Sequence, residues 1–313
     1  MTMSEPLQNE SVSLPSNEAD SDIFPTDINA ATTLVGLFGW PVTHSISPQM
    51  HNAAFVARQM NWRYLAFAVP PDRVPAAVAA LPALGLRGVN VTLPHKQAVM
   101  PHLQHWTPAA EAIGAVNTIV VEKDGQLTGD NTDGAGFIAD LQAHSVEPEG
   151  KRALVIGAGG SSRAVVYGLA EAGVESVKIL NRTVTKAVDL AATMQSYFPE
   201  ISISGAAFPD DVTGNSQGAD LIVNCTSLGM EPRIEGLPWE ENVEFREDQI
   251  VYDLVYNPAM TRLLQLASTD GATAIGGLGM LVYQGAIAWE KWTGETAPVA
   301  VMQQATNIIF ERR

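Results

Sequence analysis

The sequence is poor in basic residues and contains a single cysteine. It has 18 Lys and Arg against 34 Asp and Glu, for a formal net charge of −16. This charge argues against nucleic acids and anionic membranes as partners, since both require a basic surface. The one cysteine, Cys225, excludes an internal disulfide and is typical of a reducing compartment. No apolar run approaches the roughly 20 residues of a membrane-spanning helix, so we expect a cytoplasmic protein.

Apolar residues make up 46 % of the 313 residues, which is enough for a sizeable buried core. By length, the chain is expected to form about two domains. Its first 30 residues contain no Lys or Arg and several acids, unlike a secretory signal or a transit peptide. Residues 1–30 are therefore predicted to form an acidic, disordered extension.

From about residue 34, short strands and helices alternate. "LVGLF", "WRYLAFAV" and "LRGVNVTL" predict buried strands. The Ser47-Pro48 pair predicts an N-cap followed by proline at the first helical position, opening a helix through Met60. "NTIVVEKDGQLTGDN" predicts a hairpin that turns at Asp124-Gly125. A further helix is expected from Asp133.

In "NVTLPHK", a strand runs into a proline that is soon followed by Lys96. A helix is predicted from about His95, which would place this lysine at a helix N-terminus. A cation is disfavoured there by roughly 0.3–1 kcal/mol, because the helix dipole is positive at that end. Either Lys96 is an ordinary surface lysine, or its charge takes part in a chemical reaction.

The second half of the chain repeats the alternation in longer units. "RALVIGAGGSSRAVVYGLAEAG" predicts a strand, a glycine turn and a helix, and "SVKILNRT" a second strand. "ADLIVNCTS" and "DQIVYDLVY" predict further buried strands, and two helices are expected at the C-terminal end. This pattern predicts an α/β fold with parallel sheets covered on both faces, and two domains with a cleft between them.

The glycine turn is a candidate dinucleotide site. Gly157, Gly159 and Gly160 follow a strand and precede a helix, which permits a tight turn and close backbone approach to a pyrophosphate. Ser162 replaces the third glycine of the usual pattern. The alternative interpretation is a purely structural turn.

The end of the next strand indicates which nucleotide is bound. "NRTVTK" offers Asn181, Arg182, Thr183 and Lys186, where an NAD-binding protein would carry an acid for the ribose hydroxyls. Two cations without an acid suit a 2′-phosphate, so NADP is favoured as the cofactor. The alternative is a solvated helix start with incidental cations.

Several motifs together resemble the shikimate dehydrogenase family. They are "GWPVTHSISPQMHNAAF", "GVNVTLPHK", "GAVNTI", "GDNTDGAGF", "VIGAGGSSRA", "NRTVTKA", "YDLVYNP" and "GLGMLVYQGA", in the order and at the spacings of that family. The resemblance implies NADP-dependent, reversible interconversion of shikimate and 3-dehydroshikimate in aromatic amino-acid and chorismate biosynthesis. It also implies a substrate domain at residues 31–140 and 275–313, and a Rossmann-like, doubly wound NADP domain at residues 141–274.

The resemblance implies that Lys96 and Asp133 are the catalytic pair. A lysine beside the reacting oxygen can take or return its proton, or stabilise the alkoxide. Taken alone, Lys96 would be a surface lysine and Asp133 a turn or N-cap residue. Because such a pair titrates as a unit, the sequence leaves open which of the two holds the proton.

The resemblance also assigns the remaining site residues. Ser45 and Ser47 would bind the substrate carboxylate, and Tyr256 would be a further substrate contact. The ring hydroxyls would meet amides and hydroxyls, which both donate and accept hydrogen bonds. These ligands are Asn90, Thr92, Asn117, Asp133 and Gln284. The cofactor-binding residues would be Gly157, Ala158, Gly159, Gly160, Ser161, Asn181, Arg182, Thr183 and Lys186, with Leu254, Gly277 and Met280 near the nicotinamide.

Two other functions stay open at this point. A quinate/shikimate dehydrogenase of broader specificity resembles the same family but often prefers NAD, which "NRTVTK" argues against. A non-catalytic NADP-binding sensor could have lost Lys96 or Asp133, yet both are present. Monomers and homodimers both suit the family. His102 and His105 have a chelating spacing but no further ligands nearby in the sequence, so no metal site is predicted.

Overall fold

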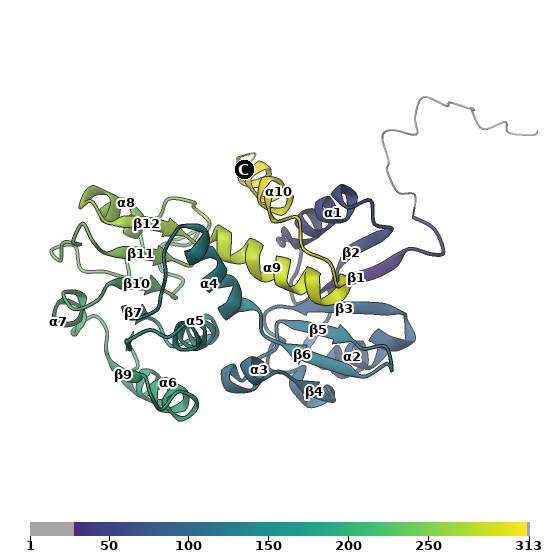
Figure 1. The fold of residues 1–313 in the computed structure, drawn as a ribbon, viewed down its shortest axis with the longest axis horizontal. Helices are drawn as coiled ribbons and strands as arrows, with labels where there is room; N and C mark the ends of the chain where they lie inside the picture. Colours follow the sequence, from purple (N-terminus) through teal and green to yellow (C-terminus); the bar gives the residue numbers. More distant parts are fainter. Residues whose placement is uncertain (1–27, 312–313) are drawn as a thin grey trace, which may run out of the picture.

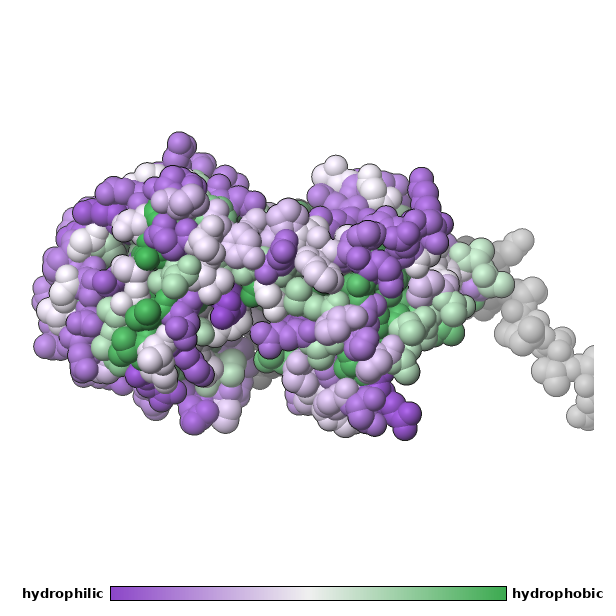
Figure 2. Space-filling view, turned by 90° about the horizontal axis from the view of Figure 1, so that it is seen from below, coloured by the Kyte–Doolittle hydropathy of each residue, from purple (hydrophilic) through white to green (hydrophobic). Residues whose placement is uncertain are grey.

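The structure, a computed structural model, describes residues 28–311. The predicted acidic extension lies outside the described residues, apart from residues 28–30. In the described part of the chain, two six-stranded sheets form separate lobes that are joined by helices (Figure 1). Seen from below, the lobes meet at a narrower middle (Figure 2). No helix within residues 28–311 is long and apolar enough to cross a membrane.

The first sheet is mixed, with the strand order β2-β1-β3-β5-β6-β4. Its strands are β1 (Thr33–Gly39), β2 (Trp62–Ala68), β3 (Leu86–Val91), β4 (His105–Trp106), β5 (Thr118–Val121) and β6 (Leu127–Asp130). Strand β1 pairs in parallel with β2 and β3, whereas β5 is antiparallel to both β3 and β6. The prediction of parallel sheets is therefore wrong here. The predicted hairpin at Asp124-Gly125 explains the difference, because so short a connection can only join antiparallel strands.

The second sheet is entirely parallel, with the strand order β12-β11-β10-β7-β8-β9. Its strands are β7 (Arg152–Ile156), β8 (Ser176–Asn181), β9 (Ser202–Ala207), β10 (Leu221–Asn224), β11 (Ile250–Asp253) and β12 (Thr273–Gly276). Strand β7 lies in the middle, and the chain runs outward from it first on one side and then on the other. This is the doubly wound order in which ligands bind beyond the carboxyl ends of the strands, at the point where the order reverses.

Two helices connect the lobes and pack side by side (Figure 1). Helix α4 (Asp133–Ala143) leads from the first sheet to the second, and α9 (Leu278–Thr293) leads back. A Cβ atom on Gly136 of α4 would lie 2.6 Å from the backbone nitrogen of Gln284 in α9. Glycine at this position therefore allows the two backbones to approach closely.

The other helices pack around the two sheets or, like α10, against other helices. They are α1 (Ser47–Ala57), α2 (Val74–Ala83), α3 (Pro108–Ile113), α5 (Gly160–Glu171), α6 (Val184–Tyr197), α7 (Val212–Ser216), α8 (Arg262–Thr269) and α10 (Val299–Glu311), with 3-10 turns at Pro71–Arg73 and Met100–His102. Helix α1 begins at Ser47, so Ile46 rather than Ser47 is its N-cap, and it ends at Ala57 rather than Met60.

The helix predicted from His95 does not form. Residues 92–99 contain only turns before the 3-10 helix at Met100–His102. The carbonyl of Lys96 accepts a hydrogen bond from the backbone nitrogen of Val116 at 2.8 Å, which diverts it from a helical partner. Pro101 has no N–H to continue a helical ladder. Lys96 therefore does not lie at a helix N-terminus, and the predicted dipole cost does not arise.

Candidate active site

A cavity of about 410 Å³ lies between the lobes, bounded by segments from both. Its walls come from the loop after β1, the end of β3, the start of α4, the loop after β11 and the start of α9. All nine residues predicted to contact substrate line it: Ser45, Ser47, Asn90, Thr92, Lys96, Asn117, Asp133, Tyr256 and Gln284. Four of the predicted cofactor residues line it as well: Ser161, Leu254, Gly277 and Met280.

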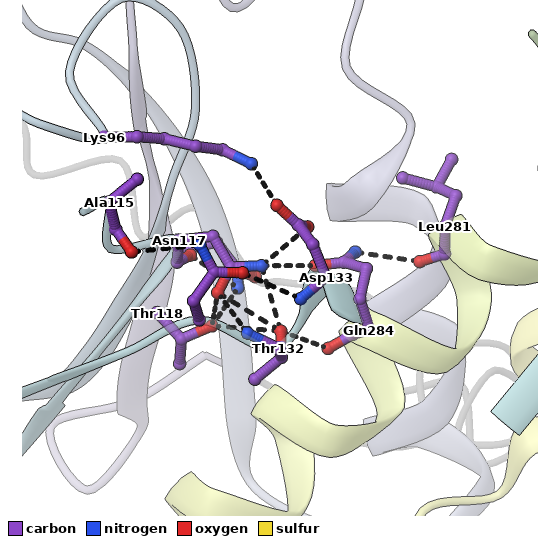
Figure 3. Close-up of polar contacts among 10 residues, drawn as sticks. Lys96, Ala115, Asn117, Thr118, Thr132, Asp133, Leu281 and Gln284 are labelled. Carbon is purple, nitrogen blue, oxygen red and sulfur yellow. Dashed lines mark hydrogen bonds and ion pairs between the residues drawn. The ribbon is translucent and has the colours of Figure 1, made fainter. Parts of the chain in front are cut away.

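Lys96 and Asp133 both line this cavity, and their charged ends point toward each other (Figure 3). The Lys96 Nζ atom donates to Asp133 Oδ2 at 2.6 Å, and the two side chains are 27 % and 15 % exposed. They are thus partly desolvated yet open to a small molecule. The turn that carries Lys96 is anchored by buried His95, whose Nε2 atom lies 2.7 Å from the Val69 carbonyl. This imidazole faces the backbone rather than the cavity.

The second carboxylate oxygen of Asp133 is held by Asn117 (Figure 3). Asn117 Nδ2 donates to Asp133 Oδ1 at 2.8 Å, while its own Oδ1 accepts from the backbone nitrogen of Thr132 at 2.9 Å. Asn117 is 2 % exposed, so these bonds fix its amide. The Gln284 side chain is tethered to the Leu281 carbonyl at 2.8 Å, and its Oε1 atom lies 3.4 Å from Asn117 Nδ2. Asp133 is therefore held from both sides.

The wall nearest α1 carries the hydroxyls predicted to bind the carboxylate. Ser45 and Ser47 are half-buried, and Ser45 Oγ accepts from the backbone nitrogen of Ser47 at 3.3 Å. Both hydroxyls lie at the N-terminal end of α1, where the helix dipole favours an anion. Asn90, near the end of β3, and Thr92, just after that strand, both line the cavity. Side chains two residues apart in an extended chain point to the same side.

The loop after β11 is held in place by a buried carboxylate. Asp253 is fully buried and accepts from Asn224 Nδ2 at 2.8 Å, from Thr261 Oγ1 at 2.6 Å and from the Val255 nitrogen at 3.0 Å. Burial raises the pKa of Asp253, and these hydrogen bonds partly oppose the increase. The adjacent Leu254 lies very close to Gly277. A Cβ atom on residue 277 would lie 2.8 Å from the Leu254 Cα. Glycine at 277 is thus required by chain packing alone.

The glycine turn after β7 has room for a ligand. Gly157 has φ +112°, a conformation that side chains rarely adopt. Cβ atoms on Gly159 or Gly160 would meet nothing within 4 Å, and both residues are exposed at the start of α5. Ser162, in place of the third glycine, is fully buried and accepts from the Gly159 nitrogen at 3.2 Å. The small residue at this position therefore also orders the turn.

The predicted phosphate ligands lie beyond the cavity, after β8. Arg182 and Lys186 are exposed, and within residues 28–311 neither side chain forms an ion pair or a hydrogen bond. Asn181 Nδ2 donates to the Thr183 carbonyl at 2.9 Å and so shapes the turn between them. Two unpaired cations beside the glycine turn are the chemistry that an NADP 2′-phosphate requires.

The sequence interpretation missed the residues that support this site. Thr118, Thr132 and Tyr64 line no part of the cavity, yet they bond to residues that do. The antiparallel register that places Thr118 opposite Asn90 would have identified one of them. That register depends on sheet pairing, which a motif search does not include.

Three family models match the chain. They describe the shikimate dehydrogenase substrate binding domain (residues 37–119), shikimate/quinate 5-dehydrogenase (residues 140–236) and the shikimate 5′-dehydrogenase C-terminal domain (residues 277–306). The NADP(+) shikimate dehydrogenase of Moorella thermoacetica is 49 % identical over 286 residues, covering 88 % of this chain and 93 % of its own length.

Solved structures agree with these matches. A shikimate dehydrogenase in complex with NADP+ superimposes with a TM-score of 0.84 at 40 % identity, covering 91 % of this chain and 98 % of that one. The Listeria monocytogenes enzyme in complex with shikimate and NAD gives 0.85 at 34 % identity, covering 90 % and 98 %. By its motifs, its two sheets and these relatives, the chain belongs to the shikimate dehydrogenase family.

Proposed function

We propose that this protein is an NADP-dependent shikimate dehydrogenase, which reversibly reduces 3-dehydroshikimate to shikimate in the shikimate pathway. The observation that carries the proposal is the Lys96–Asp133 pair at 2.6 Å, in a cavity whose walls also hold the predicted carboxylate and hydroxyl ligands. Residues 31–140 and 275–313 would hold the substrate, and residues 141–274 would hold NADP.

The chemistry of the step requires one hydride and one proton. NADPH, when bound, supplies the hydride, which forms the new C–H bond at the ketone carbon. Lys96 and Asp133 deliver the proton to the ketone oxygen as the carbonyl π pair becomes an O–H bond. In the reverse direction the pair accepts that proton from the hydroxyl. Ser45 and Ser47 orient the substrate through its carboxylate, so that the reacting carbon faces Leu254, Gly277 and Met280.

The residues of the second lobe fit NADP. The exposed glycine turn leaves backbone free for a pyrophosphate at the start of α5, and Arg182 with Lys186 offers charge to a 2′-phosphate. No acid follows β8 to hold a free ribose diol, since the chain there reads "NRTVTK". These features favour NADP over NAD.

Nicotinamide absorbance, which changes as the cofactor is oxidised or reduced, tests the proposal. Purified protein is assayed with shikimate or quinate, each with NADP or NAD. We expect turnover to be fastest with shikimate and NADP. Turnover with quinate and NAD alone would reject the proposal in favour of a quinate dehydrogenase. NADP binding without turnover in any combination would indicate a sensor.

A further inference from the structure

A line of buried hydrogen bonds runs from Tyr64 to the Asp133 carboxylate. The Tyr64 hydroxyl donates to Asn90 Oδ1 at 2.9 Å, and Asn90 Nδ2 donates to Thr118 Oγ1 at 3.1 Å. Thr118 Oγ1 then donates to Asn117 Oδ1 at 2.9 Å, and Asn117 Nδ2 donates to Asp133 Oδ1 at 2.8 Å. Every donor points in the same direction, so the bonds polarise one another toward the carboxylate.

The start of this line is rigid. Tyr64 is 1 % exposed, and its ring stacks on His51 with centroids 4.3 Å apart. Its backbone nitrogen and carbonyl both bond to the Asn52 amide at 2.9 Å. His51 and Asn52 belong to α1, the helix whose first residue is Ser47. Tyr64 therefore lies where strand β2 is fixed to α1, the helix whose first residue lines the cavity.

Thr118 occupies the middle of the line and is fully buried. An amide can present either its oxygen or its NH₂ group, whereas a hydroxyl can accept from one neighbour and donate to another. By accepting from Asn90 and donating to Asn117, the Thr118 hydroxyl favours the observed orientation of both amides. In the opposite orientation, Asn117 would turn its oxygen toward the Asp133 carboxylate and repel it.

Other contacts to the two amides limit how much depends on Thr118. The Thr132 hydroxyl lies 3.2 Å from Asn117 Oδ1. The backbone nitrogen of Thr132 also donates to Asn117 Oδ1, at 2.9 Å, and Asn90 Nδ2 lies 3.3 Å from the Asn117 carbonyl. Removing the Thr118 hydroxyl should therefore loosen the two amides without releasing them.

We infer that Thr118 is a positioning residue for the proposed reaction. Its hydroxyl orients the amides of Asn90 and Asn117, and through Asn117 it holds the Asp133 carboxylate opposite Lys96. The inference rests on the proposed function, but the orientation of the amides can be observed without turnover.

The test compares Thr118→Val, which keeps the β-branched shape but lacks the hydroxyl, with Thr118→Ser, which keeps the hydroxyl. Thr306→Val is the matched control, because Thr306 is equally buried and its hydroxyl donates to the Gln303 carbonyl in α10. We expect Thr118→Val to lower kcat about tenfold, as for loss of one buried hydrogen bond. NADP affinity should not change. Thr118→Ser and Thr306→Val should keep wild-type kcat.

Crystal structures of the wild type and Thr118→Val supply a second measurement. We expect the Asn117 amide to move away from Asp133 in the variant. Wild-type kcat together with an unmoved amide in Thr118→Val would overturn the inference, as would an equal loss in Thr118→Ser. If Thr118→Val does not fold, Thr118→Ala takes its place in both measurements. An inactive wild type would instead refute the proposed function, and the amide positions would still test Thr118.

Discussion

The side chains that line the cavity are held by hydrogen bonds to one another and to buried residues behind them. Asn117 holds Asp133, while Thr118 and Tyr64 bond to the amides of Asn117 and Asn90. All nine predicted substrate residues line this cavity, because "HSISP", "NVTLPHK" and "GDNTDG" lie where strands end or helices begin at its border. The partners of Asn90 and Asn117 were not predicted. Thr118 and Tyr64 are ordinary strand residues in the sequence, and only strand pairing brings them beside those amides.

Arg182 supports a prediction at the residue scale. Arg182→Asp replaces a cation at the end of β8 with an acid, which would repel a 2′-phosphate and suit a ribose diol. We expect the KM for NADP to rise at least tenfold, with a much smaller change for NAD, in steady-state assays with each cofactor. The control is Lys123→Asp, the same charge reversal on the exposed hairpin. Equal effects of Arg182→Asp on both cofactors would remove the phosphate assignment.

Among the elements, most strands and helices were predicted, and the failures have physical causes. The helix expected from His95 is absent because Val116 takes the Lys96 carbonyl and Pro101 lacks an N–H. Strands β4, β9 and β12 were not predicted, because they are short or carry few apolar residues. Their pairing depends on neighbours that are distant in the sequence.

The contact between α4 and α9 yields a stability prediction. Gly136→Ala would place a Cβ 2.6 Å from the Gln284 nitrogen, so one helix must shift. We expect a loss of roughly 1–3 kcal/mol in the free energy of unfolding, the usual cost of overpacking. Urea denaturation measures it. Gly214→Ala in α7 is the control, since its Cβ would meet nothing within 4 Å. A Gly136→Ala protein as stable as the control would show that the two helices are less tightly packed than described.

An ion pair between Arg152 and Asp220 joins the N-terminal ends of strands β7 and β10. Its strength has a defined pH dependence. Arg152 bonds to Asp220 through its backbone nitrogen at 2.9 Å and its guanidinium at 2.8 Å. The hydrogen bond from the Arg152 side chain lowers the pKa of Asp220 to about 2. Because the folded pKa lies below the unfolded value of 3.8, the stabilisation is present above that value and is lost as pH falls toward about 2.

Asp220→Asn should therefore destabilise the protein at pH 7 by roughly 1 kcal/mol, a value reduced for partial exposure of the pair. The difference from wild type should shrink between pH 4 and pH 2, as followed by denaturant unfolding at each pH. Asp210→Asn, an exposed acid without an ion pair among the described residues, should show neither effect. A pH-independent difference for Asp220→Asn would contradict the ion-pair account.

Across the whole molecule, two lobes were expected from the alternating pattern, and two sheets are observed. The packing of α4 against α9 was not predicted, because the hydrophobic periodicity of a sequence describes each helix separately. This packing brings Gln284 of α9 close to Asn117 and to the start of α4, where Asp133 lies. The cavity thus combines segments that are far apart in the sequence. The proposed catalysis requires the fold to bring these segments together.

The central claim is that Lys96 and Asp133 act as one unit on the substrate proton. A kinetic cycle of wild type, Lys96→Ala, Asp133→Asn and the double variant, with shikimate and NADP, tests it directly. Each single variant should lower kcat on the order of 10²–10⁴-fold, far more than it weakens shikimate binding. The double variant should lose about as much as the worse single variant, because groups that act together are not additive. Losses that multiply, or a Lys96→Ala enzyme with unchanged kcat, would contradict the account.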